Sequence, residues 1–181
     1  TLLTSSAASD VYKRQVPGYD RHFKLLENFG IEMITVPFQK DGPDLNAIED
    51  LINSESNIHG IVCVPRHSNP TGHTFSDDNV EQLFKLIEPL KENFSIFWDN
   101  AYACHDIEDT IQQTPADQIA KKIGLENNLF QVGSTSKITL AGSGISFISS
   151  SADNLSKFID FRNAITPCLL YTSPSPRDIP L

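Results

Sequence analysis

Three short polar stretches carry side chains that could perform chemistry together. They are Asn69-Pro70-Thr71-Gly72, Asp99-Asn100-Ala101-Tyr102 and Ser134-Thr135-Ser136-Lys137, and each follows a largely apolar run. A lysine at the carboxyl end of a buried strand lies where desolvation can lower its pKa and make its amine a nucleophile, although most lysines are solvated surface residues. The other two stretches add an amide, a carboxylate and a phenol, and such a set is suited to an enzyme that uses a cofactor.

These stretches lie within an alternating series of predicted strands and helices. Apolar or β-branched runs bounded by turn residues predict strands at 31–38, 58–65, 95–98, 129–132 and 145–148. Apolar residues at helical spacing predict helices at 20–30, 45–53, 76–90, 116–123 and 153–165. The alternation predicts an α/β fold, a three-layer α/β/α sandwich on a mostly parallel sheet.

The predicted fold brings the polar stretches together. They follow the predicted strands at 58–65, 95–98 and 129–132. The carboxyl ends of parallel strands share one edge of a sheet, and ligands bind outside that edge. We therefore expect the amide, the carboxylate, the phenol and the amine to converge in one cleft.

Both ends of the chain look like translated sequencing adapters. If residues 10–15 are written as GAT GTG TAT AAG AGA CAG, the reverse complement of that DNA, read one base out of frame, encodes residues 168–173. A Ser-rich head and a Pro/Ser-rich tail of a disordered protein would have the same composition. We expect residues 1–15 and 168–181 to be artefacts and residues 16–167 to be one domain, cut at both ends.

Charge and cysteine content narrow the class of protein. The formal net charge is -9, which argues against a nucleic-acid-binding surface. No apolar run approaches the length of a membrane span. The three cysteines suggest neither a disulfide framework nor a metal site. We expect a cytoplasmic protein with no metal, no nucleic-acid partner and no membrane partner.

Five motifs, in their order and spacing, resemble the pyridoxal-phosphate-dependent aminotransferases of fold type I. They cover essentially all of residues 16–167 and are Pro17-Gly18-Tyr19-Asp20-Arg21-His22-Phe23, Gly42-Pro43-Asp44, Val64-Pro65 with Asn69-Pro70-Thr71-Gly72, Asp99-Asn100-Ala101-Tyr102 and Ser134-Thr135-Ser136-Lys137. The subgroup resembled most is that of the divergent aspartate aminotransferases, which is related to the aminotransferase-like domains of some transcriptional regulators.

This resemblance implies that residues 16–167 are part of the large domain of such an enzyme. It implies pyridoxal 5'-phosphate as the cofactor, and an acidic amino acid (aspartate or glutamate) and a 2-oxo acid as substrates. It also implies that the complete protein is a homodimer.

The same resemblance implies roles at the cofactor ring. Lys137 bonds to the cofactor aldehyde and later moves the proton of the substrate. Asp99 pairs with the protonated pyridine nitrogen, so that the ring can accept electrons. Asn69 and Tyr102 hydrogen-bond the phenolic oxygen of the ring, and Tyr19 stacks on the ring face.

The phosphate side of the site departs from the usual pattern. Ser134 matches a phosphate ligand, and Ser136 or backbone amides could share this task. Many relatives place a phosphate-binding arginine shortly after the lysine, whereas this chain has Gly142-Ser143-Gly144-Ile145 in that region. The arginine that relatives use for the substrate carboxylate has no match in residues 16–167. We therefore expect the polypeptide as given to have little or no activity.

Simpler interpretations stay open for several of these residues. Residues 69–72 could form an ordinary β-turn, Asp99 could cap the segment after its strand, and Tyr19 could be a half-buried aromatic. His67 and His105 lie near the expected cleft but match no catalytic position, and we expect them to support the site residues or the fold. Alternative functions are a β-eliminating lyase that uses the same cofactor, or the ligand-sensing domain of a transcriptional regulator. A decayed cofactor site is the third alternative, and the intact set of site residues argues against it.

Overall fold

The computed structural model describes residues 2–5, 20–55, 57–107, 112–139 and 144–165. The described strands are β1 (Leu2–Ser5), β2 (Ile31–Ile34), β3 (Phe38–Gln39), β4 (Gly42–Pro43), β5 (Ile58–Cys63), β6 (Ser95–Asp99), β7 (Leu129–Ser134) and β8 (Ser146–Ser149). The described helices are α1 (Asp20–Asn28), α2 (Leu45–Ser54), α3 (Asp77–Ile87), α4 (Ala116–Ile123) and α5 (Ala152–Ile165), with a 3-10 helix at Glu88–Asn93.

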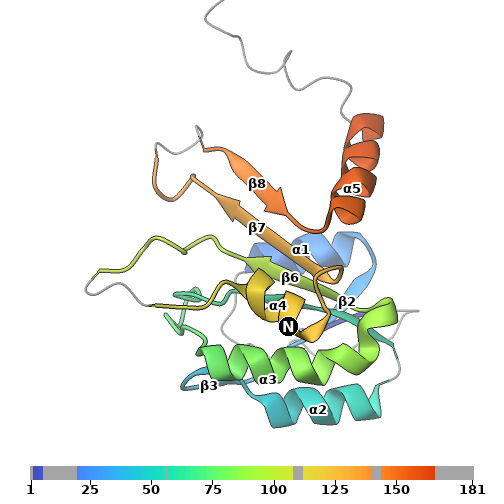
Figure 1. Ribbon diagram of the computed structural model, residues 1–181, viewed down its shortest axis with the longest axis vertical. Coiled ribbons are helices and arrows are strands. Elements are labelled where there is room, and N and C mark those ends of the chain that lie inside the picture. Colours follow the sequence, from blue (N-terminus) through green and yellow to red (C-terminus); the bar gives the residue numbers. More distant parts are fainter. Residues whose placement is uncertain (1, 6–19, 56, 108–111, 140–143, 166–181) are drawn as a thin grey trace, which may run out of the picture.

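A six-stranded sheet organises the described residues. Its strand order is β2-β1-β5-β6-β7-β8 (Figure 1). Strands β5, β6 and β7 pair in parallel. Strand β1 is antiparallel to both β2 and β5, so β2 runs in the same direction as the parallel set, while β8 is antiparallel to β7. The prediction of a mostly parallel sheet is confirmed, because β2, β5, β6 and β7 all share one direction.

Helices lie on both faces of this sheet, as the three-layer prediction requires. Helices α2, α3 and α4 lie together below the sheet in Figure 1, and α1 lies on the other side, next to β2. The side chains of β6 alternate between the two faces. Ile96 and Trp98 are buried against the α3 layer, whereas Phe97 points to the opposite face, where it stacks on Phe130 at 5.4 Å between ring centroids.

The core between the sheet and α3 is built around Trp98. The rings of Phe75 and Phe84 meet the Trp98 indole edge-on, at centroid distances of 5.9 and 5.6 Å. Phe84 and its neighbour Leu83 on α3 are completely buried. Edge-to-face aromatic packing of this kind fixes the position of α3 over β6.

Helix α3 begins where the sequence predicts and ends earlier. Ser76 caps its first turn, because the Ser76 hydroxyl accepts a hydrogen bond from the backbone N–H of Asn79 at 3.1 Å. The predicted helix at 76–90 was expected to continue to Leu90. The α-helix instead ends at Ile87, and residues 88–93 form a 3-10 helix. Pro89 is the physical reason, because proline has no N–H to donate and its ring crowds the preceding turn.

The strand predicted at 31–38 is also shorter than expected. Strand β2 ends at Ile34, and Pro37 separates it from β3. The ladder between β1 and β2 has its last pair at Leu2–Ile34, and Pro37, which lies between β2 and β3, cannot donate to a ladder. Strands β3 and β4 form a separate small hairpin. Gly42 is needed there, because a Cβ on this residue would lie 2.2 Å from the Asn79 side-chain oxygen.

Residues 2–5 take part in the sheet, although we expected residues 1–15 to stay outside the fold. Leu2–Ser5 forms β1, which pairs with β2 on one side and with β5 on the other. Strands β2 and β5 each present a row of backbone N–H and C=O groups toward this position. An inserted strand satisfies both rows, whatever the origin of its sequence. The adapter origin of residues 1–15 and 168–181 stays a prediction.

Helix α5 stands apart at the β8 end of the sheet (Figure 1). Its apolar side chains Phe158, Ile159 and Phe161 are exposed. Nowhere in the described part of the chain does a helix have both the length and the apolar character that a membrane crossing needs.

The two cysteines in the described residues lie in contrasting environments. Cys63 ends β5 and is 3% exposed, and this burial raises the pKa of its thiol to about 12. Cys104 lies in the loop after β6 and is exposed. The thiolate is the reactive form of cysteine, so burial protects Cys63 in two ways, by excluding the reagent and by disfavouring ionisation.

We predict that iodoacetamide at about pH 8, near the ordinary thiol pKa of about 8.5, labels Cys104 and spares Cys63 in the folded chain. A Cys168→Ser background leaves these two thiols for comparison. Peptide mass spectrometry measures the labelling, and the same reaction in urea serves as the control in which both thiols react. Equal labelling of the two cysteines without urea would contradict the burial of Cys63.

Candidate active site

The carboxyl ends of β5, β6 and β7 meet at one edge of the sheet. In the parallel ladders Cys63 pairs with Trp98, and Asp99 pairs with Val132. Beyond the ladder, the backbone N–H of Asn100 donates to the Val132 carbonyl at 2.8 Å. The expectation that the three polar stretches share one edge is confirmed.

Three of the expected site residues come together at this edge. The side-chain amide of Asn69 donates to the phenolic oxygen of Tyr102 at 3.4 Å. The Lys137 amine lies 5.7 Å from the centre of the Tyr102 ring. The Tyr102 phenol, in the loop after β6, therefore lies near an amide from the loop after β5 and an amine from the turn after β7.

Lys137 is exposed, whereas we expected a desolvated amine. The reason is its position. The ladder between β7 and β8 ends at the pair Ser134–Ser146, and Lys137 lies in the turn beyond that pair. The turn is nevertheless ordered by its own backbone, because the Thr135 carbonyl accepts hydrogen bonds from the N–H groups of Ile138 and Thr139, both at 2.9 Å.

Asp99 is the last residue of β6 and is half-buried. One of its carboxylate oxygens accepts a hydrogen bond from the backbone N–H of Ala101 at 3.0 Å. The interpretation of Asp99 as a cap is therefore correct as far as it goes. The cap also fixes the carboxylate at the strand end, on the edge that Asn69, Tyr102 and Lys137 share.

Asn69 lies in a closed turn. The N–H of Gly72 donates to the Ser68 carbonyl at 2.6 Å, and the N–H of Ser68 donates to the His73 carbonyl at 2.9 Å. Gly72 has a φ of +73°, a conformation that glycine adopts without steric cost. The β-turn interpretation and the site interpretation are thus compatible, because the turn presents the exposed Asn69 side chain toward Tyr102.

The two serines expected at the phosphate lie side by side. The Ser134 and Ser136 hydroxyl oxygens are 2.7 Å apart, and the Ser136 N–H donates to the Ser134 oxygen at 3.1 Å. Ser134 is the last residue of β7, and Ser136 directly precedes Lys137. Two hydroxyl groups that are already paired in space provide a small polar surface in the residues that lead to Lys137.

The glycine bend is folded tightly against this turn. A Cβ on Gly144 would lie 2.2 Å from the Ser136 hydroxyl oxygen and 2.7 Å from the Ser136 backbone nitrogen. Thr135 and Ile145 exchange two hydrogen bonds of 2.9 Å, one through the Thr135 N–H and one through its hydroxyl. Gly142 and Ser143, the rest of the expected bend, lie outside the described residues.

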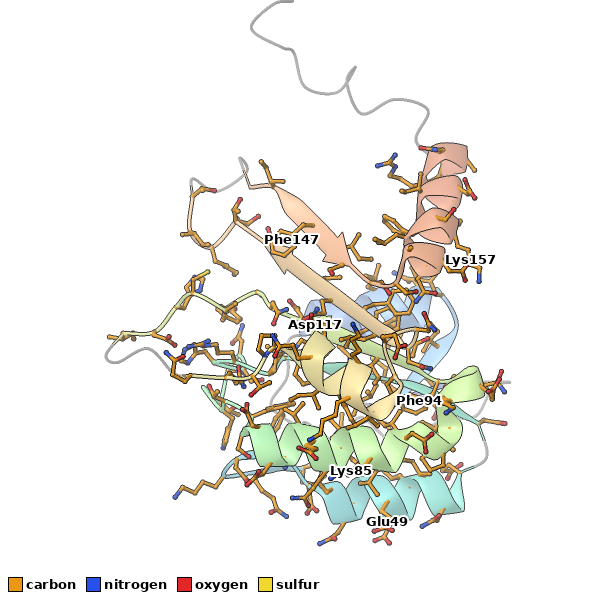
Figure 2. All side chains as sticks on the ribbon, in the orientation of Figure 1. Glu49, Lys85, Phe94, Asp117, Phe147 and Lys157 are labelled. Atoms are coloured by element: carbon orange, nitrogen blue, oxygen red, sulfur yellow. The ribbon has the colours of Figure 1, made fainter. Side chains whose placement is uncertain are left out.

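Strand β8 supports the same turn from the side. Phe147 lies against β7 (Figure 2), and a Cβ on Gly133 would come within 2.4 Å of the Phe147 ring. At Gly144 a side chain would collide with backbone atoms of Ser136, and at Gly133 it would displace the Phe147 ring. The lack of side chains at these two positions lets β8 and its bend approach the residues that lead to Lys137.

Sequence reasoning assigned no site role to a group of residues beside Asn69 and Tyr102. Arg66 and His67 both bind the carboxylate of Asp106. His105 packs edge-on against Tyr102 at 5.5 Å, with its Nε2 3.4 Å from the Lys137 carbonyl oxygen. His67 and His105 have the structural contacts we expected of them.

The sequence contained a partial indication that Arg66, His67 and Asp106 belong near the site. Asp106 belongs to an acidic segment, and Arg66 and His67 directly precede the turn that holds Asn69. Nothing in the local spacing says that residues 40 positions apart form a pair. Tyr19, the residue expected to stack on the cofactor ring, lies outside the described residues, so its placement stays a prediction.

Comparison with known proteins identifies relatives of this chain. A family model described as aspartate amino-transferase matches residues 9–167. A protein from Mycolicibacterium smegmatis described as an aminotransferase is 46% identical over 145 residues, which cover 79% of this chain and 33% of the relative. The aspartate aminotransferase of Corynebacterium glutamicum is 44% identical over 140 residues, which cover 77% of this chain and 32% of the relative.

Solved structures agree with these matches. The crystal structure of an aspartate transaminase from Corynebacterium glutamicum superposes with a TM-score of 0.73 at 39% identity, covering 83% of this chain and 35% of the other. A PLP-bound aminotransferase structure from Clostridium difficile has a TM-score of 0.67 at 22% identity and covers 84% of this chain and 38% of the other, which shows a shared fold. The chain spans about a third of the length of the curated relatives it matches.

We predict that Gly144→Ala disturbs the lysine turn. The added methyl group collides with backbone atoms of Ser136, and overpacking of this kind costs about 1–3 kcal/mol of unfolding free energy. Urea unfolding measures the loss, and hydrogen exchange should show faster exchange in residues 133–139. Ser149→Ala, at an exposed position on β8, is the control. Unchanged exchange in the Gly144→Ala chain would contradict the close approach.

Proposed function

Since the chain belongs to the aspartate aminotransferase family, we propose that it is part of a pyridoxal-phosphate-dependent transaminase. The reaction is the transfer of an amino group between an acidic amino acid, aspartate or glutamate, and a 2-oxo acid. The observation that carries the proposal is the meeting of Lys137, Tyr102 and Asn69 at one sheet edge, with the amine 5.7 Å from the phenol ring and the amide 3.4 Å from the phenolic oxygen.

The side chains at this edge fit pyridoxal 5'-phosphate chemically. The cofactor has an aldehyde for an amine, a ring nitrogen for a carboxylate, a phenolic oxygen for hydrogen-bond donors and a phosphate for hydroxyl and N–H groups. Lys137 provides the amine for the aldehyde, and Asp99 provides the carboxylate for the ring nitrogen. Tyr102 and Asn69 provide hydrogen-bond donors for the phenolic oxygen. The paired hydroxyls of Ser134 and Ser136 supply polar contacts for the phosphate. We propose Tyr19 for the ring face, as the resemblance implies.

When bound, the cofactor supplies an electron-accepting ring that stabilises negative charge on the substrate α-carbon. The Lys137 Nζ is the base that this chain provides for holding and returning a proton at that carbon. The Asp99 carboxylate is fixed by its hydrogen bond from the Ala101 N–H. Its negative charge would stabilise the protonated form of the ring nitrogen.

Tyr102 and Asn69 act as an oriented pair. The Asn69 amide donates its hydrogen to the Tyr102 oxygen, so the Tyr102 O–H remains able to donate to another acceptor. With the cofactor bound, its phenolic oxygen would be that acceptor. The aromatic face of Tyr102 also lies under the Lys137 amine, and attraction between a cation and an aromatic ring favours this placement.

Substrate choice and assembly are proposed for the whole protein. The C. glutamicum relative, whose name gives aspartate, supports aspartate or glutamate as the amino donor. A homodimer and a cytoplasmic location complete the proposal. Because the chain spans only about a third of its curated relatives, the activity belongs to the complete enzyme, and we propose that the polypeptide by itself transfers little or no amino group.

We predict that Lys137 is the preferred site at which pyridoxal phosphate bonds to this chain. The chain is mixed with pyridoxal phosphate and reduced with borohydride, which makes the bond permanent. Peptide mass spectrometry then gives the share of adduct on each lysine. Lys137→Ala should abolish the dominant adduct, because the amine held beside Tyr102 is lost.

Lys157→Ala is the matched control, since Lys157 lies on α5 and pairs with Asp153 at 2.7 Å (Figure 2). This variant should leave the Lys137 adduct unchanged. Equal labelling of all exposed lysines in the unaltered chain would contradict a cofactor site at Lys137.

A further inference from the structure

A single carboxylate connects two of the loops that build the site. One oxygen of Asp106 accepts a hydrogen bond from the Arg66 Nε at 3.1 Å and lies 2.7 Å from the His67 Nε2. The other oxygen binds the Arg66 Nη2. Arg66 therefore holds the carboxylate with two parallel bonds, the geometry in which guanidinium and carboxylate interact most strongly. We call Arg66, His67 and Asp106 the loop bridge.

The loop bridge is placed next to the residues that meet at the site. Arg66 and His67 lie in the loop after β5, directly before the turn that carries Asn69. Asp106 lies in the loop after β6, four residues beyond Tyr102. The bridge thus joins the same two loops that touch through the bond between Asn69 and Tyr102.

The two contacts between these loops differ in strength. The bond between Asn69 and Tyr102 is long, at 3.4 Å, and involves an exposed amide, so water competes with it. The Arg66 and Asp106 side chains are each only 13% exposed. Charge-assisted bonds that are shielded from water are the stronger ones. The loop bridge, and not the bond between Asn69 and Tyr102, is therefore able to set the distance between the loops.

The backbone of the first loop is shaped to serve the bridge. His67 has a φ of +48°, in the left-handed region that residues other than glycine seldom occupy. Such a conformation persists when surrounding contacts hold it. The His67 N–H donates to the Thr74 hydroxyl at 3.1 Å, and the His67 ring binds Asp106. This turn directs consecutive side chains, Arg66 and His67, to the same carboxylate.

Backbone turns in the loop after β6 bring Asp106 to Arg66 and His67. The N–H of Ala103 donates to the Asn100 carbonyl and the N–H of His105 donates to the Tyr102 carbonyl, both at 3.2 Å. His105 then packs against the Tyr102 ring and approaches the Lys137 carbonyl at 3.4 Å. Tyr102 is therefore held by the turn from Asn100 to His105 and by the attachment of Asp106 to Arg66 and His67.

We infer that Asp106 is a positioning residue that, through Arg66 and His67, sets the placement of Asn69 and Tyr102 at the site. Asp106 need not touch the cofactor or the substrate for this role. Its consequence for cofactor binding rests on the proposed function, whereas its effect on the two loops does not.

Nuclear magnetic resonance of the isotope-labelled 181-residue chain tests the inference without any cofactor. The readout is the nuclear Overhauser contact between the Asn69 side-chain amide and the Tyr102 ring. Asp106→Asn keeps the shape of the side chain and removes the charge that binds Arg66, and we expect it to abolish the contact. Asp153→Asn is the matched control, because it removes the carboxylate of an exposed ion pair on α5, and it should leave the contact unchanged.

A second variant covers the case in which Asp106→Asn does not fold, as judged by the Trp98 indole resonance. His67→Asn keeps a residue that tolerates the left-handed backbone but is too short to reach Asp106. Because Arg66 still binds Asp106 in this variant, the contact should be weakened rather than abolished. Wild-type contact intensity in a folded Asp106→Asn or His67→Asn chain would overturn the inference.

Borohydride trapping of pyridoxal phosphate on the same chains separates this inference from the proposed function. Loss of the nuclear Overhauser contact together with a reduced Lys137 adduct supports both. If the variants lose the contact but the unaltered chain forms no Lys137 adduct, the loop bridge is supported and the cofactor site is contradicted. Retention of the contact contradicts the loop bridge, whatever the adduct shows.

Discussion

Parallel pairing of β5, β6 and β7 is the constraint on which the candidate site depends. Because the three strands run in one direction, their carboxyl ends deliver Asn69, Asp99 with Tyr102, and Ser134 with Lys137 to the same edge. An antiparallel β6 would carry its polar end to the opposite edge. The packing of Trp98 against Phe84 on α3 holds β6 in this arrangement, so the core and the site are parts of one structure.

Close approach of backbone segments gives the edge its detailed shape. Gly133 and Gly144 lack the side chains that would separate β7 from Phe147 and from the bend after the lysine turn. The bend carries no arginine among its described residues, and its contribution is to support the turn that holds Ser134, Ser136 and Lys137. The described part of the bend thus contributes backbone contacts to this turn.

The sequence predicted the fold better than it predicted the boundaries of its elements. Alternating apolar patterns located the helices and strands, and a proline lies two or three residues beyond the early ends at Ile34, Cys63 and Ile87. The place of Leu2–Ser5 in the sheet could not be foreseen from the four residues themselves. It depends on β2 and β5, because each of them pairs with β1 through its backbone. Burial was also overestimated for Lys137, whose turn extends beyond the last ladder pair.

The sequence by itself determined which chemical groups follow which strands, because strand periodicity and turn residues are local properties of the chain. That information was sufficient to expect Asn69, Tyr102 and Lys137 at one edge. Only the tertiary structure decided how these groups are held. The bridge from Asp106 to Arg66 and His67 joins residues about 40 positions apart, and the contact between Gly144 and Ser136 depends on the path of a bend. Such contacts are set by the packing of whole elements, which no local pattern of residue types records.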